Sequence, residues 1–395
     1  MSRLLVLGAG PAQLGLLRRA RERGLVVIAC DKDPAAPGFA YADRRALVSS
    51  EDEDGVERLA RAEEVDGLVS PGADWPVALA ARVAERLGVP HPLAPGVARV
   101  VVSKLRQREL LEAAGVPQPR HVVVGRRDDA RAAADAIGYP CVVKAPDRQG
   151  QRGITPVASP EGIAAAIEAA VAVSRSGAVL IEELVPGPEV TVNAIAIDGE
   201  LHPLTVTDRL VAGPPAFGVA LAHAWPSAHD VADAVAVTRA AAAALGVASG
   251  PVYAQLVLGP DGARMIELAA RLGGGHDAAL CQAALGVDLD GLAIAAALGE
   301  PVEPPVSRPT TGACVRFLVP PVGELVAVEG LAEASGLPGV VDVGVYRRPG
   351  WRFGPLRAGA DRAGYVLATG ADRDAALEVA DRAADLVRFR VSDGD

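Results

Sequence analysis

Apolar and polar positions follow strand and helix periods from the start of the chain, and their order is that of an α/β unit. Apolar runs at 3–7, 25–30 and 67–70 predict three strands, and the segments between and after them predict helices, one of which ends at Gly88. Because strands that alternate with helices form parallel sheets, this part of the chain predicts a Rossmann-like N-terminal domain.

A glycine turn from Gly8 to Gly15 follows the first strand, and Asp31 ends the second strand. Dinucleotide-binding domains place a glycine-rich turn and a ribose-binding acid at these two points. The spacing here is G-x-G-x-x-x-x-G rather than G-x-G-x-x-G. A nicotinamide-dependent oxidoreductase is therefore the weaker hypothesis.

Two lysines stand where phosphate could be bound. Lys104 lies in a helix predicted over 100–114, and Lys144 ends a short apolar strand. The polar loop that follows Lys144 contains Gly150 and Gly153. An ammonium group holds phosphate as a point charge, and glycines let backbone N–H groups approach it. The segment alone is equally consistent with an ordinary strand end and an exposed loop.

The next stretch predicts a hinge and then a loop over a site. An apolar strand near 178–183 runs into two glutamates and breaks at Pro-Gly, which indicates a hinge between lobes. Asp198-Gly199 predicts a hairpin turn. Residues 202–226, with Arg209 and His223, predict an irregular loop over a site, although a lone histidine is more often structural.

The chemistry is expected at two β-prone runs on either side of a Gly-Pro-Asp-Gly segment, which predict an antiparallel hairpin. A five-residue loop would pair Leu258 with Arg264 and place Gln255 opposite Glu267, with Arg271 further along the same face. We expect these last three side chains to converge before a triple glycine, as a site for a metal and an anion. A surface hairpin with a solvated ion pair is the alternative.

The tail resembles a small α+β module behind a Pro-rich link. Three domains are predicted, at 1–100, 101–305 and 306–395, and a lid lobe at about 118–186 within the second. The tail elements are predicted as a strand at 313–319, a helix at about 324–335, strands at 340–346 and 364–369, and a helix at 372–387.

Composition narrows the classes of function. The 395 residues carry 39 basic and 49 acidic side chains, a net charge of −10, which argues against nucleic acid as a partner. No run of about 18 apolar residues is present, so no membrane helix is expected. The four cysteines are widely spaced and lack a C-x-x-C pattern, which favours buried thiols in a reducing compartment. We expect a cytoplasmic protein, and a homodimer is left open.

The order of these motifs resembles the ATP-grasp superfamily over nearly the whole chain. Within it, Glu267-Leu-Ala-Ala-Arg271 and the tail resemble the L-amino-acid ligases that form dipeptides. The resemblance implies an ATP-grasp fold of α/β and α+β lobes with an N-terminal Rossmann-like domain, a mobile lid and a C-terminal module. The residues that carry it are Gly8–Gly15, Lys104, Cys141–Lys144, the loop to Gly153, Ile181–Val185, Glu189 and Met265–Gly274.

The resemblance also implies roles. Arg271 and Glu267 would be catalytic, Gln255 and Glu267 would bind Mg²⁺, with Mn²⁺ as an alternative, and an amino acid and an amine would be the substrates. An acyl phosphate formed from ATP would be the intermediate. The implied ATP-binding residues are Lys104, Lys144, Gly150, Gly153, Glu182, Glu183, Leu184, Val185 and Glu189. The candidate substrate pocket is formed by Gly273, Gly274, His276, Asp277, Arg209 and His223.

Two positions depart from the family pattern. Gln255 stands where an acidic ligand is common and Ala269 where asparagine is common, so Glu267 is expected to make most of the protein's contact with the metal. Two further hypotheses remain open: a purine-pathway enzyme that carboxylates or formylates a ribonucleotide, and a weakened ATP-binding module.

Overall fold

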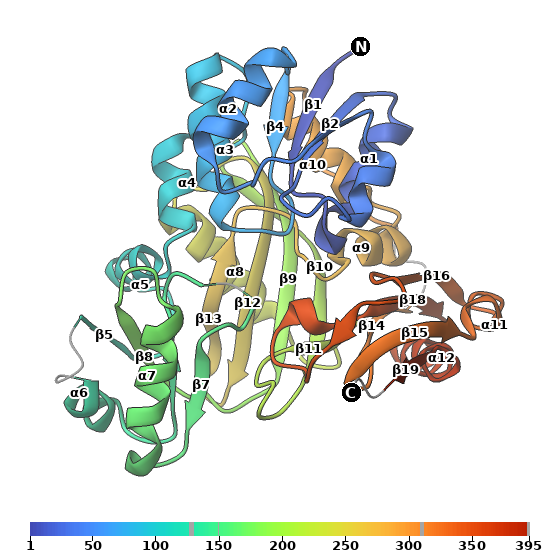
Figure 1. The fold of residues 1–395 in the computed structure, drawn as a ribbon. Coiled ribbons are helices and arrows are strands. Elements are labelled where there is room, and N and C mark those ends of the chain that lie inside the picture. The colour runs from blue at the N-terminus through green and yellow to red at the C-terminus, as the bar shows by residue number, and fades with distance from the viewer. Residues whose placement is uncertain (126–129, 149, 309–311, 393–395) are drawn as a thin grey trace.

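The computed structural model describes residues 1–125, 130–148, 150–308 and 312–392. Its N-terminal part is a parallel sheet of order β3-β2-β1-β4, at the top of Figure 1. The apolar runs of β1, β2 and β4 are buried on both faces, as in parallel sheets generally, whereas the edge strand β3 is exposed. The strands are β1 (Arg3–Leu7), β2 (Val26–Cys30), β3 (Arg44–Ala46) and β4 (Gly67–Val69), and the helices are α1 (Leu14–Glu22), α2 (Glu53–Ala62) and α3 (Trp75–Leu87).

The predicted helix at 100–114 is two helices, α4 (Pro95–Val101) and α5 (Lys104–Ala113). The break occurs because Ser103 has extended backbone angles and its side chain accepts a hydrogen bond from the Arg106 N–H, which makes it the N-cap of α5. Lys104 is therefore the first residue of a helix, where the chain leaves the N-terminal part.

A separate antiparallel sheet of order β5-β8-β6-β7 forms the lobe at the lower left of Figure 1. Its helices pack on one face around an aliphatic core of alanine, valine and isoleucine. This sheet lies within the range predicted for the lid. Its elements are β5 (His121–Val124), α6 (Ala130–Ile137), β6 (Cys141–Lys144), β7 (Ile154–Val157), α7 (Ile163–Val173) and β8 (Val179–Glu183).

An eight-stranded sheet of order β13-β12-β9-β10-β11-β14-β18-β16 forms the body of the molecule. The sheet runs across the predicted boundary at 305/306, because β11 pairs with β14 along four residues. Asp198 and Gly199 form the predicted turn between β9 and β10. The strands are β9 (Glu189–Ile197), β10 (Glu200–Val211), β11 (Ala220–Trp225), β12 (Gly250–Gly259), β13 (Gly262–Ala269), β14 (Gly312–Leu318), β16 (Val340–Val345) and β18 (Gly364–Gly370).

The prediction of an irregular segment at 202–226 was wrong, since β10 and β11 occupy most of it. The polar residues that obscured the strand pattern are buried in the sheet: Thr205, Thr207, Asp208 and Arg209 are at most 8% exposed. Their hydrogen bonds and ion pairs compensate for burial. A strand whose two faces are both covered need not alternate apolar and polar residues.

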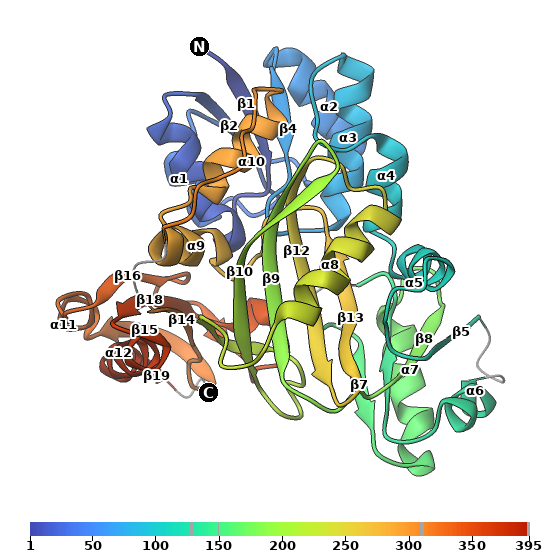
Figure 2. The same cartoon turned by 180° about the vertical axis from the view of Figure 1, so that it is seen from behind.

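Helices cover the body on two sides. Figure 2 shows α8 (Ala232–Ala244) across the face of β9, β12 and β13. The helices α9 (Asp277–Leu285) and α10 (Leu289–Ala297) lie between the body and α1, with which α10 shares an apolar cluster. Within the described ranges, no helix is long and apolar enough to cross a membrane.

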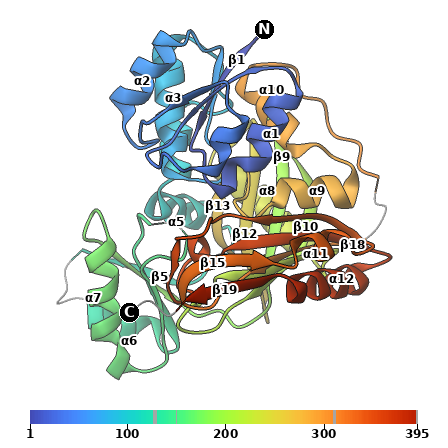
Figure 3. The ribbon, with the colours of Figure 1, turned by 45° about the vertical axis from the view of Figure 1, so that its right-hand side comes forward.

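The C-terminal part adds a second small sheet of order β17-β15-β19, and Figure 3 brings it to the front. The prediction of a helix at about 324–335 was wrong for the first half of that range, which forms strand β15. Alternate residues there are buried, and Leu325 packs on Phe353. The remaining elements are β15 (Gly323–Glu329), α11 (Leu331–Ser335), β17 (Arg352–Phe353), α12 (Arg373–Leu386) and β19 (Arg388–Ser392).

Candidate active site

The hairpin of β12 and β13 brings Gln255 opposite Glu267, as predicted, although by a different register. The turn has two residues, so that Leu258 pairs with Ala263 and not with Arg264. A β-bulge between Gln255 and its neighbour then restores the predicted pair. Such a bulge adds one residue to a strand and redirects the side chains beyond it.

A buried arginine that the sequence analysis missed holds this bulge. Arg108 of α5 donates hydrogen bonds to the backbone oxygens of Met265 (3.1 Å) and Ile266 (2.7 Å). Its Nε also donates to Glu182 Oε1 at 2.6 Å. Arg108 follows Lys104 by four residues, so both side chains lie on one face of α5. That spacing was the available signal.

Lys104 reaches the same hairpin. Its Nζ donates to Glu267 Oε1 at 2.8 Å and to the Arg148 backbone oxygen at 2.9 Å. Burial would raise the pKa of Glu267, but the charge and hydrogen bond of Lys104, with the charge of Arg271, hold it below its ordinary value. The Glu267 carboxylate is therefore ionised at neutral pH.

Lys144 and Glu182 form a second buried ion pair, at the end of β6 and in β8. Glu182 also pairs with Arg108, and its side chain is 1% exposed. Burial alone would raise the pKa of Glu182, but Arg108 and Lys144 lower it to about 2. The carboxylate thus positions Lys144 and Arg108.

Arg271 contacts the N-terminal part rather than Glu267. Its guanidinium lies 2.6 Å from Asp74 Oδ1 and 5.4 Å from the centre of the Tyr253 ring. Burial would lower its pKa, but Asp74 and Glu267 raise it, so it carries full charge. Asp74 precedes α3, and the sequence analysis gave it no role because no local motif marks it.

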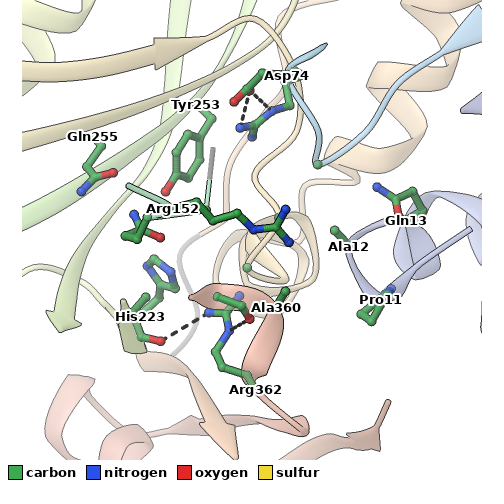
Figure 4. Close-up of a pocket in the computed structure, with 18 of the residues that line it drawn as sticks. Pro11, Ala12, Gln13, Asp74, Arg152, His223, Tyr253, Gln255, Ala360 and Arg362 are labelled. Atoms are coloured by element: carbon green, nitrogen blue, oxygen red, sulfur yellow. Dashed lines mark hydrogen bonds and ion pairs between the residues drawn. The ribbon is translucent and has the colours of Figure 1, made fainter. Parts of the chain in front are cut away.

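Two cavities meet at the hairpin. The apolar cavity, of about 520 Å³, lies between the lobe of β5–β8 and the body. The cationic cavity, of about 330 Å³, lies between the body, the N-terminal part and the C-terminal part (Figure 4). Four residues line both cavities: Gln151, Arg209, Gln255 and Glu267.

The predicted residues divide between these cavities. Seven of those predicted for ATP line the apolar cavity, together with aliphatic side chains of β6, β8 and β12. Gly150, Gly274, Arg209 and His223 line the cationic cavity. The seven are Lys104, Lys144, Glu182, Glu183, Leu184, Val185 and Glu189.

Four predicted residues line neither cavity: Gly153, Gly273, His276 and Asp277. Gly153 lines neither cavity, and a methyl group added there would lie 2.5 Å from Val173. Gly273 and His276 border a small separate cavity of about 70 Å³. The His276 ring stacks on Tyr365 with centroids 3.6 Å apart, and burial lowers its pKa to about 4. His276 is thus a neutral packing residue in this structure.

Asp277 supports the glycine loop from behind. It is 2% exposed, and its Oδ2 accepts a hydrogen bond from the Gly275 N–H at 3.0 Å. Its Oδ1 accepts one from Asn193 at 3.3 Å. A methyl group on Gly273 would lie 2.2 Å from the same carboxylate, so glycine is required there by close approach.

Glu189 lines the apolar cavity and accepts hydrogen bonds from two residues that line both cavities. Its Oε2 accepts hydrogen bonds from Gln255 Nε2 at 2.8 Å and from Arg209 Nε at 3.1 Å. The amide nitrogen of Gln255 is thereby committed to Glu189, and its oxygen stays available as an acceptor. In the described residues no cluster of three His, Cys, Asp or Glu could hold a metal. Glu267 and the Gln255 oxygen are nevertheless oxygen donors of the kind that Mg²⁺ prefers.

Residues 150–152, which precede β7, line the cationic cavity, and the backbone around them is mostly left-handed. Gly150, Gln151 and Gly153 have φ angles of 69°, 64° and 70°. Left-handed angles are easy for glycine and uncommon for glutamine. Between them Arg152 lines the cavity, and Figure 4 shows its side chain extended across it.

The sequence of this chain is similar to two protein-family models and to several known proteins. Residues 316–392 match the protein-family model "L-amino acid ligase C-terminal domain 2", and residues 110–213 match "D-ala D-ala ligase C-terminus". A formate-dependent phosphoribosylglycinamide formyltransferase of Burkholderia thailandensis is 29% identical over 98% of this chain and 95% of its own length. A protein of Sinorhizobium fredii, "Uncharacterized protein y4rH", is 27% identical over 97% of this chain and 81% of its own.

Solved structures establish the fold. An L-amino acid ligase from Bacillus licheniformis aligns with a TM-score of 0.84 at 19% identity, over 100% of this chain and 99% of that one. A phosphoribosylglycinamide synthetase from Anaerococcus prevotii aligns with a TM-score of 0.78 at 20% identity, over 99% and 100%. The chain has the ATP-grasp fold expected from its motifs, and it resembles ATP-grasp ligases over its whole length.

Proposed function

We propose that this ATP-grasp chain is an ADP-forming ligase that joins an amino acid, or a similar carboxylate, to an amine through an acyl phosphate. The observation that carries the proposal is the meeting of the two cavities at Gln255 and Glu267. A nucleotide in one cavity and a carboxylate in the other would face each other across these residues. The match of the tail to an L-amino acid ligase module supports the amino-acid substrate.

The apolar cavity is the proposed ATP site. Leu184 and Val185 would offer apolar surface and backbone groups to adenine, and Glu189 and Glu183 lie along the same wall. Lys104 and Lys144 would contact phosphate oxygens. Both lysines hold glutamates at present, so the nucleotide phosphates would compete with Glu267 and Glu182 for them. The lid loop at Gly150 and Gly153 would approach the phosphates.

The proposed reaction has two steps, phosphoryl transfer to the carboxylate and attack of the amine on the acyl phosphate. A carboxylate oxygen of the substrate attacks the γ-phosphorus, and the bond from that phosphorus to the bridging oxygen breaks, releasing ADP. The amine nitrogen then attacks the acyl carbon, inorganic phosphate leaves, and the amine loses a proton. Arg271 would stabilise the transferring phosphoryl group and the acyl phosphate, since a fixed guanidinium is suited to developing negative charge.

The metal site is proposed at Glu267 and Gln255. When bound, Mg²⁺, or Mn²⁺ as an alternative, neutralises phosphate charge and aligns the reacting oxygens. The Glu267 carboxylate would be the principal ligand, with the Gln255 oxygen beside it. Metal binding would then break the hydrogen bond from Lys104 to Glu267, or the carboxylate would contact both cations. Either way, metal binding would affect the first residue of α5.

The experiment is ADP release from ATP and Mg²⁺ with pooled L-amino acids, followed by mass spectrometry of the products. The proposal predicts ADP release that depends on amino acids and a condensation product lighter than its two substrates by one water. A parallel reaction with formate and glycinamide ribonucleotide tests the second candidate, which the Burkholderia thailandensis relative favours by its 29% identity. ADP release only in that reaction would refute the amino-acid ligase.

A further inference from the structure

A third cavity, which we call the junction cavity, lies between the N-terminal part and the lobe of β5–β8. Its volume is about 520 Å³. It shares Lys104 with the apolar cavity, and Asp74 and Arg152 with the cationic cavity. It therefore borders the ion pair of Lys104 with Glu267 and that of Asp74 with Arg271. The proposed reaction uses none of the residues that line this cavity alone.

The lining of the junction cavity has an excess of positive charge. Among its described residues, six cationic side chains face three carboxylates. Glu51 pairs with Arg175 at 2.7 Å, and Asp147 accepts a hydrogen bond from the Ser176 N–H at 2.7 Å. Asp74 is the third carboxylate and is held in its own ion pair. Positive charge that the lining does not neutralise attracts an anion. The six cations are Arg82, Arg99, Lys104, Arg148, Arg152 and Arg175.

Two of these arginines, Arg148 and Arg99, form no ion pair in the described ranges. Arg148 is fixed by its Nε, which donates to the Val173 backbone oxygen. Its Nη1 and Nη2 have no hydrogen-bond partner among the described residues. A guanidinium fixed in this way offers its remaining N–H groups to an oxyanion. Arg99 is exposed in the last turn of α4, so it marks the solvent side of the cavity.

Lys104 lies between the junction cavity and the proposed site of phosphoryl transfer. Its Nζ donates to Glu267, the proposed metal ligand, at 2.8 Å. The same Nζ donates to the Arg148 backbone oxygen at 2.9 Å. The phosphate released from the acyl phosphate would therefore form beside a cation that also lines the junction cavity. Arg148 and, on the solvent side, Arg99 supply further positive charge along that cavity.

We propose that the junction cavity is a binding site for inorganic phosphate and that it receives the phosphate released in the second step. The source of this phosphate rests on the proposed ligase function, whereas the site itself is separate from those of the nucleotide and the carboxylate. Arg148 and Arg99 bind the oxyanion through charge-assisted hydrogen bonds. Because the cavity is lined by the N-terminal part and by the lobe of β5–β8, bound phosphate contacts both. Phosphate can then leave past Arg99 while ADP is still bound.

The test is calorimetric titration of sodium phosphate into the full chain, with and without saturating Mg²⁺ and the non-hydrolysable ATP analogue AMP-PNP. The analogue competes for the apolar cavity, so phosphate that binds in its presence occupies another site. We expect phosphate to bind in both conditions. The titration is repeated with four variants: Arg148→Gln, Arg99→Gln, Arg362→Gln and Arg106→Gln.

Arg148→Gln should weaken phosphate binding tenfold or more, because hydrogen bonds to charged groups are the strong ones. Arg99→Gln should weaken it by a smaller factor, because solvent screens an exposed charge. Since Arg99 is exposed, its variant keeps the test valid if Arg148→Gln does not fold. Arg106→Gln should bind as the parent does, because this exposed arginine of α5 lines none of the three cavities.

Absence of phosphate binding in the presence of AMP-PNP would overturn the inference. Equal binding by the parent, Arg148→Gln and Arg99→Gln would do so as well. Arg362 lines the cationic cavity and neither of the other two. Loss of phosphate binding in Arg362→Gln, with binding retained in Arg148→Gln, would therefore place the anion in the wrong cavity and refute the proposed site.

The source of the phosphate is tested by product inhibition in the reaction with pooled L-amino acids, followed through the condensation product. Added phosphate should inhibit the parent at saturating ATP. Arg148→Gln should raise the inhibition constant of phosphate and leave that of ADP unchanged. Inhibition that excess ATP removes completely would overturn the inference and leave the ligase function intact. Absence of ADP release in every pool would refute the ligase function and this source of phosphate, and the calorimetric titration then decides the phosphate site by itself.

Discussion

Replacement of Glu182 by glutamine tests the buried charges beneath the apolar cavity. Glu182 is 1% exposed and accepts from Arg108 and Lys144, whose side chains are 4% and 10% exposed. Glutamine keeps the size of the side chain but removes its charge. Two cations would then be buried with no carboxylate between them. Loss of one partner from a buried pair costs about 3–5 kcal/mol.

The lowered pKa of Glu182 corresponds to a stabilisation of similar size. A fall from 4.5 to about 2 corresponds to about 3 kcal/mol, at 1.36 kcal/mol per pH unit. Because the folded-state pKa is the lower one, this stability is fully present above pH 4.5 and is lost as pH falls toward 2. The difference between the parent and Glu182→Gln should therefore be constant at neutral pH and shrink in acid.

The assay is urea unfolding monitored by hydrogen exchange in β6 and β8, since a multi-lobed chain need not unfold in one step. The matched control is Glu183→Gln. Its carboxylate pairs with Arg120, whose side chain is 65% exposed, and such surface pairs contribute about 0–1 kcal/mol. If Glu182→Gln lost no more protection than Glu183→Gln, or kept its deficit at pH 3, the proposed role of the buried charges would be wrong.

Three further predictions follow from the site. Arg271→Met should lower kcat for ADP release by about 100-fold or more with a small change in KM for ATP, and an unchanged kcat would contradict its role. Gln255→Glu removes the hydrogen-bond donor that lies 2.8 Å from Glu189 and should lower the free energy of unfolding by about 1.5–3 kcal/mol. Added Mg²⁺ should restore the melting temperature of the variant. An equal response of the parent and the variant to Mg²⁺ would argue against the metal site. Gly273→Ala, which puts a methyl group 2.2 Å from a buried carboxylate, should cost about 1–3 kcal/mol in urea unfolding, whereas Gly96→Ala, with no atom within 4 Å, should not destabilise.

The sequence was sufficient for the local parts of the site. Strand period and the turn residues predicted the hairpin, and Gln255 does lie opposite Glu267. The correct pair followed from an incorrect loop length, because the bulge added the residue that the shorter turn removed. Bulges depend on contacts from elsewhere, here the Arg108 side chain on the backbone, and no local pattern reports them.

The long-range pairs were beyond sequence reasoning. Nothing near Asp74 indicates that it meets Arg271, which is 197 residues away. The pair of Glu182 and Arg108 was equally hidden, because their separation in sequence conceals their contact in space. His276 was a reasonable candidate as a polar residue after three glycines, yet its stacking on Tyr365 is determined by how the C-terminal part docks.

The unbroken sheet limits how this protein can be divided or recombined. The L-amino acid ligase match begins at residue 316, inside β14, whose partners are β11 on one side and β18 on the other. If the C-terminal part were separated from the rest at the link before β14, the backbone donors and acceptors of β11 and β14 would lose their partners. Such free strand edges promote aggregation. Chimaeras that exchange the C-terminal part between relatives must therefore match the pairing of β11 with β14.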